Sequence, residues 1–220
     1  MAETIRVLIA DDHPLILGAL RQAVSGAISG VQIHEARDLD SLAATLQAEP
    51  EMDLVLLDLS MPGVRGFSGL LYLRAERPGV PVIVVSANED RAVMRYCLEF
   101  GAAAYVPKSA DIETIRVAIR TVLDGGRWTP PDLDATPGDK ETAALVKRLS
   151  SLTPQQIRVL MMLSQGLLNK QIAYELSVSE ATVKAHVSAI LQKLDVESRT
   201  QAVILAGKIE RAQDFAAAAS

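Results

Sequence analysis

Five ionisable or hydroxyl side chains each come at or just after the end of a short run of β-branched and other apolar residues. They are Asp11, Asp12, Asp58, Ser86 and Lys108. Carboxylate oxygens in a partly hydrated site suit Mg²⁺, which takes one or two carboxylates together with waters and phosphate oxygens. A carboxylate beside such a cation can attack a phosphoryl group and become an aspartyl phosphate. The set therefore predicts phosphoryl-transfer chemistry with Mg²⁺ as cofactor, in which Lys108 and Ser86 bind phosphate oxygens.

The apolar runs that carry these side chains alternate with helical patterns through the first 126 residues. The strand-like runs are residues 5–10, 31–36, 53–58, 81–86 and 103–106. Between and after them apolar residues recur at helical spacing, as Ile112, Ile115 and Ile119 do. This alternation predicts a (βα)₅ order. Such an order implies a parallel sheet, doubly wound, with helices on both faces.

The predicted topology brings the carboxylates together. Ligands of a doubly wound sheet bind beyond the carboxyl ends of the strands, at the point where the winding reverses. In the flavodoxin-like order 2-1-3-4-5 the first and third strands are neighbours, so Asp11, Asp12 and Asp58 reach one site. Each residue alone has an ordinary explanation, since Asp12 could cap the helix that starts near Pro14 and Lys108 could be a solvated charge. Their shared position at one end of successive strands favours a functional site.

The motifs around these residues resemble those of receiver domains over residues 3–124. They are ADDH at 10–13, LLDLSMPG at 56–63, VSA at 85–87 and VPK at 106–108. The resemblance implies that Asp58 is the phosphoacceptor and that Tyr105 moves with Ser86 upon phosphorylation. The Mg²⁺ ligands that it implies are Asp58, Asp11 or Asp12, and Ser60, the last through its main-chain carbonyl.

The end of the chain is predicted to be a small all-helical domain. Thr153 as N-cap, Pro154 at the first helical position and Gln156 at the capping-box position predict a helix start. That helix ends near Gly166, a second runs over about 169–177, and a third begins directly afterwards. This spacing is typical of a helix-turn-helix, and with a last helix the domain has four.

The third helix of this domain has one apolar and one polar face. Lys184, Ala185 and Ser188 lie opposite the apolar residues and could contact base edges in the major groove of DNA. Three further residues near helix N-termini could contact phosphate, namely Asn169, Lys170 and Thr182. An ordinary amphipathic helix has the same periodicity, so the pattern alone does not decide between the two interpretations.

A second resemblance favours DNA binding. The motifs LTP at 152–154, GLLNKQIA at 166–173, TVKAH at 182–186 and LQKL at 191–194 resemble those of LuxR-type DNA-binding domains. The order of receiver, linker and LuxR-type domain is similar to the NarL/FixJ class of response regulators. It implies that Lys184, Ala185 and Ser188 read bases, and that a helix beginning with residues 199–207 pairs two such domains. The implied partners are a histidine kinase, double-stranded DNA with a palindromic operator, and a second copy of the chain after phosphorylation.

The expected division is a receiver domain over 1–126, a linker over 127–148 and a DNA-binding domain over 149–220. Residues 1–126 hold 11 basic and 17 acidic residues, whereas residues 149–220 hold 7 and 6. A balance of +1 is a weak basic footprint, so the DNA prediction depends on motif geometry. No signal peptide and no apolar run of about 20 residues is present, which predicts a cytoplasmic protein without a membrane partner.

Several alternatives stay open at this point. The small side chains of Ala202 and Ala206, with Gly207, suit either close helix approach in a symmetric dimer or a plain core helix. The three histidines, at positions 13, 34 and 186, are scattered and predict no metal-ligand grouping.

Two other classes of function compete with the regulator. A phosphohydrolase of the haloacid dehalogenase type needs a second aspartate two residues after its nucleophile, where this chain has Ser60. We therefore expect no enzyme. A regulator or interaction module that keeps the receiver fold but works without phosphorylation is the remaining alternative.

Overall fold

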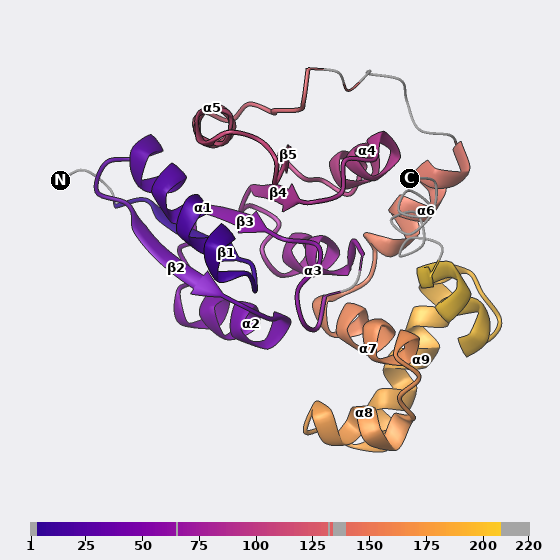
Figure 1. The fold of residues 1–220 in the computed structure, drawn as a ribbon. Helices are drawn as coiled ribbons and strands as arrows, with labels where there is room; N and C mark the ends of the chain where they lie inside the picture. The colour runs from indigo at the N-terminus through magenta and orange to yellow at the C-terminus, as the bar shows by residue number, and fades with distance from the viewer. Residues whose placement is uncertain (1–3, 65, 132, 134–139, 208–220) are drawn as a thin grey trace.

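The first part of the chain is an α/β fold with one parallel sheet (Figure 1). The computed structural model describes residues 4–64, 66–131, 133 and 140–207. The strand order is β2-β1-β3-β4-β5, which confirms the predicted flavodoxin-like (βα)₅ arrangement. The strands are β1 (Arg6–Ala10), β2 (Gln32–Ala36), β3 (Leu54–Leu57), β4 (Val82–Ser86) and β5 (Ala104–Pro107).

Helices cover both faces of this sheet, as Figure 1 shows. Helices α1 (Pro14–Ala27) and α5 (Ile112–Leu123) pack on one face, where Val7 and Ile9 of β1 belong to their apolar cluster. Leu8 and Ala10 belong to the cluster on the opposite face. The helices on that face are α2 (Leu39–Ala48), α3 (Ser68–Glu76) and α4 (Arg91–Glu99). This division follows from the two-residue period of a strand, which sends successive side chains to opposite faces.

The second described part is helical. Its helices are α6 (Lys140–Leu149), α7 (Pro154–Ser164), α8 (Asn169–Glu175), α9 (Glu180–Leu194) and a helical segment over residues 199–207. Helix α7 begins with the predicted capping box, in which the Thr153 hydroxyl accepts from the Gln156 N–H at 3.3 Å and Gln156 Oε1 accepts from the Thr153 N–H at 3.0 Å. Such a box stabilises a helix start because it satisfies two main-chain donors.

The two parts contact each other through α3 and α7, which lie side by side in Figure 1. Phe67 and Leu71 beside or in α3 line the same apolar cavity as Ile157 and Leu160 of α7. Arg158 of α7 also forms an ion pair with Asp40 at the start of α2, at 2.9 Å. One apolar core therefore continues from the α/β part into the helical part.

The predicted domain boundaries at 126 and 148 stay predictions. Residues 132 and 134–139 of the predicted linker lie outside the described residues, as do residues 208–220 of the predicted second domain. Helix α6 occupies the end of the predicted linker and contacts α9. In the part of the chain that the structure describes, no helix has both the length and the apolar character that crossing a membrane requires.

Candidate functional site

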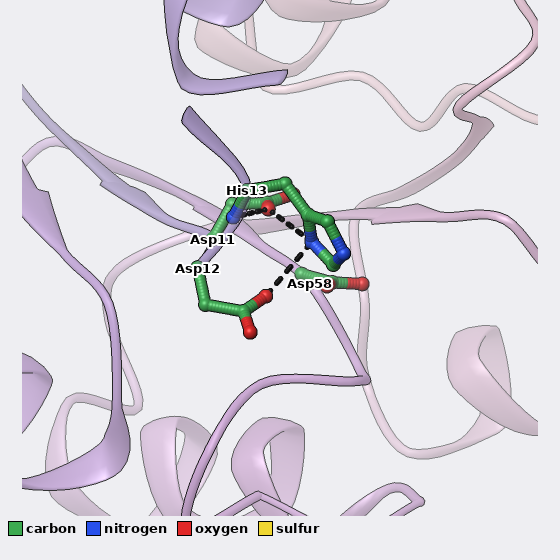
Figure 2. A group of neighbouring side chains, drawn as sticks. All are labelled: Asp11, Asp12, His13 and Asp58. Carbon is green, nitrogen blue, oxygen red and sulfur yellow. Dashed lines mark hydrogen bonds and ion pairs between the residues drawn. The ribbon is translucent and has the colours of Figure 1, made fainter. Parts of the chain in front are cut away.

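The carboxylate cluster lies where β1 and β3 end, as Figure 2 shows. These strands are paired in parallel with Ala10 opposite Leu57, so the next residues, Asp11 and Asp58, are neighbours. The Asp58 N–H donates to the Ala10 carbonyl at 2.8 Å, which continues the ladder into the site. Both carboxylates are almost completely buried, with 1% of Asp11 and 2% of Asp58 exposed. Asp12 lies at the edge of the cluster and is partly exposed.

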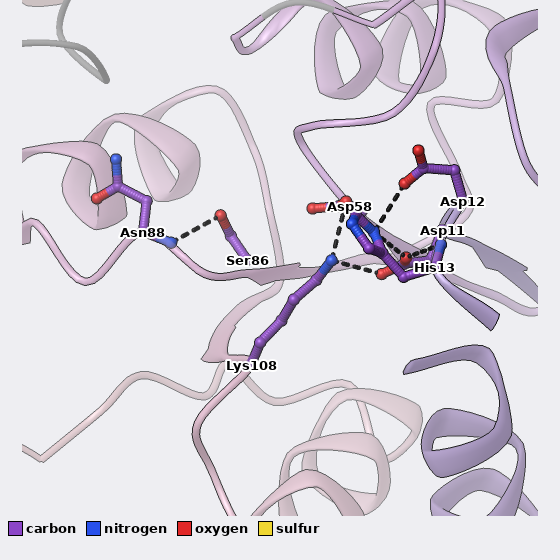
Figure 3. A network of polar contacts seen from close by, with 7 residues as sticks. All are labelled: Asp11, Asp12, His13, Asp58, Ser86, Asn88 and Lys108. Carbon is purple, nitrogen blue, oxygen red and sulfur yellow. Dashed lines mark hydrogen bonds and ion pairs between the residues drawn. The ribbon is translucent and has the colours of Figure 1, made fainter. Parts of the chain in front are cut away.

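Lys108 lies between the two buried carboxylates (Figure 3). Its Nζ is 2.7 Å from Asp11 Oδ2 and 2.9 Å from Asp58 Oδ2. The Lys108 N–H donates to the Ser86 carbonyl at 2.8 Å, so the strand pair β4 and β5 fixes the position of the lysine backbone. Burial works to lower the pKa of Lys108, but its hydrogen bonds to Asp11 and Asp58 outweigh burial, and the pKa lies above its ordinary value. Lys108 is therefore an ammonium ion at neutral pH.

The environment of Asp58 opposes its ionisation. Burial raises the pKa of this carboxyl, Lys108 works in the opposite direction, and the nearby Asp11 adds to the increase. The net pKa lies above the ordinary aspartate value. The Asp58 carboxylate is thus held close to the carboxylate of Asp11, and Lys108 is the cation that pairs with both in the described part of the chain. Two buried carboxylates that share one ammonium group favour the binding of a further cation.

The donors of this cluster fit a hard divalent cation. Asp11, Asp12 and Asp58 offer carboxylate oxygens within one small volume, and among the described residues the ammonium group of Lys108 pairs with two of them. The Ser60 side chain is exposed, while the main chain of Ser60 hydrogen-bonds the Asp58 carboxylate. Oxygen donors that are partly open to water are the type that Mg²⁺ binds.

His13 corrects the expectation that the histidines join no metal-ligand grouping. One ligand atom each of Asp11, Asp12, His13 and Asp58 lies within 4.8 Å of the others. His13 Nδ1 is 2.8 Å from Asp12 Oδ1 and 3.1 Å from Asp11 Oδ1. The three histidines are far apart in the sequence, so no grouping of them with one another was predicted. The available signal was that His13 directly follows two aspartates.

Ser86 and Tyr105 lie next to the cluster. Ser86 ends β4 and is buried, and its hydroxyl accepts from the Asn88 N–H at 3.2 Å (Figure 3). Tyr105 in β5 is fully buried, and its hydroxyl donates to the Asn88 carbonyl. The main chain of Asn88 thus links the two side chains that are predicted to move together. Their coupled movement stays a prediction.

The exposed face of α9 is open in this structure. Lys184, Ala185 and Ser188 are all exposed, whereas Val183 and Ile190 on the opposite face are fully buried. The Lys184 ammonium pairs with Glu180 one turn earlier, at 3.2 Å. An exposed pair of this kind contributes little free energy, so it does not prevent a contact with phosphate.

The residues predicted to contact phosphate lie at the starts of two helices. Lys170 in the first turn of α8 and Thr182 in the first turn of α9 are exposed, and Asn169 is half-buried. Ser179 caps α9, since its hydroxyl accepts from the Thr182 N–H at 3.1 Å. Contact of these three residues with phosphate stays a prediction.

The last described helical segment resolves part of an open alternative. Ala202 is 0% and Ala206 is 8% exposed, so both small side chains pack within the chain itself. Ala206 also lines the cavity between α3 and α7. These two alanines therefore act as core residues, and Ile204, at 48% exposure, lies on the open side of the segment.

Two family models match the chain. Residues 7–120 match the response regulator receiver domain, and residues 150–206 match the luxR family of bacterial regulatory proteins. The first model alone covers about half of the chain, including Asp11, Asp58, Ser86 and Lys108. The second covers α7, α8 and α9.

Similar proteins match over nearly the full length. A glycerol metabolism activator of Pseudomonas putida is 41% identical, over 93% of this chain and 96% of that protein. The nitrate/nitrite response regulator protein NarP of Escherichia coli strain K12 is 34% identical, over 93% and 95%. Among solved structures, RcsB from Salmonella enterica serovar Typhimurium, bound to a promoter in the presence of phosphomimetic BeF₃⁻, matches with a TM-score of 0.53 and 23% identity. It covers 92% of this chain and 98% of that one, and so low an identity supports the fold alone.

Proposed function

The chain belongs to the response regulators that join a receiver domain to a LuxR-type DNA-binding domain, and we propose from this that phosphorylation of Asp58 by a histidine kinase controls dimerisation and binding to a specific operator. One observation supports this most directly. Three carboxylates and Lys108 converge at the carboxyl ends of β1, β3 and β5, with Asp58 at the centre. Membership in a family of transcriptional regulators also agrees with the expectation that the chain is not an enzyme.

The proposed transfer forms a bond between an Asp58 carboxylate oxygen and phosphorus. The bond that breaks joins phosphorus to one ring nitrogen of the kinase phosphohistidine. The other ring nitrogen carries a proton, so the ring takes the electron pair of the broken bond and leaves as neutral imidazole. The Lys108 ammonium, now shared between Asp11 and Asp58, turns one N–H to a phosphoryl oxygen, and the Ser86 hydroxyl hydrogen-bonds another. Asp11, Asp12, Asp58 and the Ser60 carbonyl would hold Mg²⁺. When bound, Mg²⁺ supplies positive charge that offsets the carboxylates and the phosphoryl oxygens.

The phosphoryl group then has to alter the second part of the molecule. Ser86, Tyr105 and Asn88 form a connected set that begins at the end of β4. We expect the new hydrogen bond of Ser86 to shift these three residues from one arrangement to another. This shift favours the DNA-bound dimer over the monomer. Lys184, Ala185 and Ser188 then contact base edges in two half-sites of a palindromic operator.

The test is the intact mass of the full chain after incubation with acetyl phosphate and Mg²⁺. We expect wild type and Asp124→Asn, in which an exposed carboxyl at the end of α5 is replaced, to gain one phosphoryl group, and Asp58→Asn to gain none. Sedimentation and selection of bound DNA sequences are then carried out with and without the phosphoryl group. A wild-type protein that is modified but pairs and binds its operator as the unmodified protein does would contradict the proposal and favour the phosphorylation-independent regulator.

A further inference from the structure

We propose that the imidazole of His13 is a ligand of the same cation site, and that it gives the site a selective affinity for Ni²⁺ that Mg²⁺ does not share. The inference deepens the proposed function, because it rests on a cation being bound by Asp11, Asp12 and Asp58. It adds a nitrogen donor that the carboxylate set lacks. The juxtaposition that carries it is an imidazole nitrogen lying between two carboxylates at the open edge of the site (Figure 2).

The position of the ring fits a ligand. Metal–nitrogen and metal–oxygen bonds of first-row ions are about 2.0–2.2 Å long, so two donors of one ion lie at most about 4.2 Å apart. His13 Nδ1 is 2.8 Å from Asp12 Oδ1 and 3.1 Å from Asp11 Oδ1, and the four candidate donor atoms all lie within 4.8 Å. A contraction of a few tenths of an ångström therefore places all four around one ion.

The ring of His13 has no role in the helix that it precedes. His13 is the N-cap of α1, but its side chain makes no cap hydrogen bond, and Pro14 follows it at the first helical position. Its main-chain N–H donates to Asp11 Oδ1 at 2.8 Å, which fixes the backbone on the cluster. The side chain is 59% exposed, so its outer side is open to water ligands, while Lys108 reaches the carboxylates from another direction (Figure 3).

The chemistry of the donors predicts which ions benefit. Imidazole is a good ligand for Ni²⁺, Cu²⁺ and Zn²⁺, whereas Mg²⁺ takes oxygen donors and keeps several waters. A direct bond from His13 therefore raises the affinity for Ni²⁺ and leaves the affinity for Mg²⁺ nearly unchanged. A histidine that only orients Asp11 and Asp12 by hydrogen bonds would change the affinity for both ions by the same factor.

The experiment measures binding of Ni²⁺ and of Mg²⁺, in separate calorimetric titrations, to the full chain without an affinity tag. The variants are His13→Asn and His13→Phe, and His186→Asn on α9 is the control that makes the same chemical change far from the site. We expect both His13 variants to lose at least about tenfold in Ni²⁺ affinity. Their Mg²⁺ affinity stays within about twofold of wild type, and His186→Asn changes neither.

Two results would overturn the assignment. An equal loss of affinity for both ions would make His13 a positioning residue, and an unchanged Ni²⁺ affinity would give it no part in the site. Phosphorylation of wild type by acetyl phosphate in Mg²⁺ is measured in parallel. If Ni²⁺ binding depends on His13 but no phosphoryl group is gained, the His13 assignment is supported and the proposed function fails. If wild type gains a phosphoryl group and the His13 variants bind Ni²⁺ as tightly as wild type, the proposed function is supported and the His13 assignment fails.

Discussion

At the scale of the residue, ionisation of Asp58 affects the stability of the receiver. Its pKa is raised by burial and by Asp11, despite Lys108. Below the ordinary carboxyl pKa of about 3.9, both the folded and the unfolded state carry the proton, so there is no penalty. Between the ordinary pKa and the raised pKa, the unfolded state has released its proton and the folded state still holds it. The free energy of unfolding therefore falls as the pH rises through this interval. At neutral pH the folded state carries the full free-energy cost of ionising Asp58.

We therefore expect Asp58→Asn to be more stable than wild type at pH 7.5 without divalent cations. The midpoint of thermal unfolding should rise by a few degrees, and the increase should shrink as the pH falls toward the ordinary carboxyl range. Differential scanning calorimetry in EDTA over this pH range provides the measurement. Asp124→Asn, at an exposed position, should show no such trend. Equal or lower stability of Asp58→Asn at pH 7.5 would show that the ionised Asp58 carboxyl does not destabilise the fold.

At the scale of the element, the start of α9 depends on one side chain. Ser179 caps α9 by accepting from the Thr182 N–H. Ser179→Ala removes this acceptor and should lower the free energy of unfolding by about 1 kcal/mol. Ser179→Asp keeps an acceptor at the same position and should recover most of the loss. Urea unfolding followed by circular dichroism compares the three proteins, and equal stability of the alanine and aspartate variants would rule out capping as the cause.

The loop after Asp58 makes a second prediction for an element. Gly63 has φ +79°, and a Cβ there would lie 2.9 Å from Leu39 Cβ at the start of α2. Gly63→Ala is therefore expected to cost about 1–2 kcal/mol of stability. Gly18 lies on the exposed side of α1 with nothing within 4 Å of an added Cβ, and Gly18→Ala should add about 0.5–1 kcal/mol. Chemical unfolding measures the change in the free energy of unfolding for each variant. If both variants are stabilised, or both destabilised, the left-handed backbone at Gly63 does not set the cost of the substitution there.

At the scale of the whole molecule, the receiver and the helical part share the contact between α3 and α7. The Asp40–Arg158 ion pair lies at its edge, with Asp40 largely exposed. An exposed ion pair contributes at most about 1 kcal/mol. Most of the free energy that holds the receiver and the helical part together therefore comes from the apolar contact between α3 and α7. The ion pair is still the part of the contact that can be inverted without leaving a cavity.

We expect charge reversal at either position, Asp40→Arg or Arg158→Glu, to raise the fraction of molecules in which the receiver and the helical part are separated. Cleavage within residues 127–139 by a dilute protease should accelerate by up to about fivefold, and the double reversal should return the rate toward that of wild type. Asp40→Asn separates loss of the pair from repulsion between like charges. Added salt should reduce the differences. A double variant that is cleaved as fast as the faster single variant would show that the pair does not hold this contact.

The sequence by itself determined the fold and the centre of the candidate site. Two-residue and helical periodicities, the Thr153 capping box and the positions of Asp11, Asp58 and Lys108 after strands are local features, and each depends on residues close together in the chain. Strand order then follows from general rules of winding, which is why the pairing of β1 with β3 was predictable. The helix-turn-helix was recognisable for the same reason, since its spacing and motifs lie within about 40 residues.

Only the tertiary structure decided how separate segments meet. The contact of His13 with two carboxylates depends on the direction of its ring, and the bridge from Lys108 to both Asp11 and Asp58 depends on the geometry of three strands. The packing of α3 on α7, and with it the burial of Ala206, joins residues more than 80 positions apart. These contacts depend on side-chain directions and on many weak interactions of shape, and no local pattern in the sequence records either.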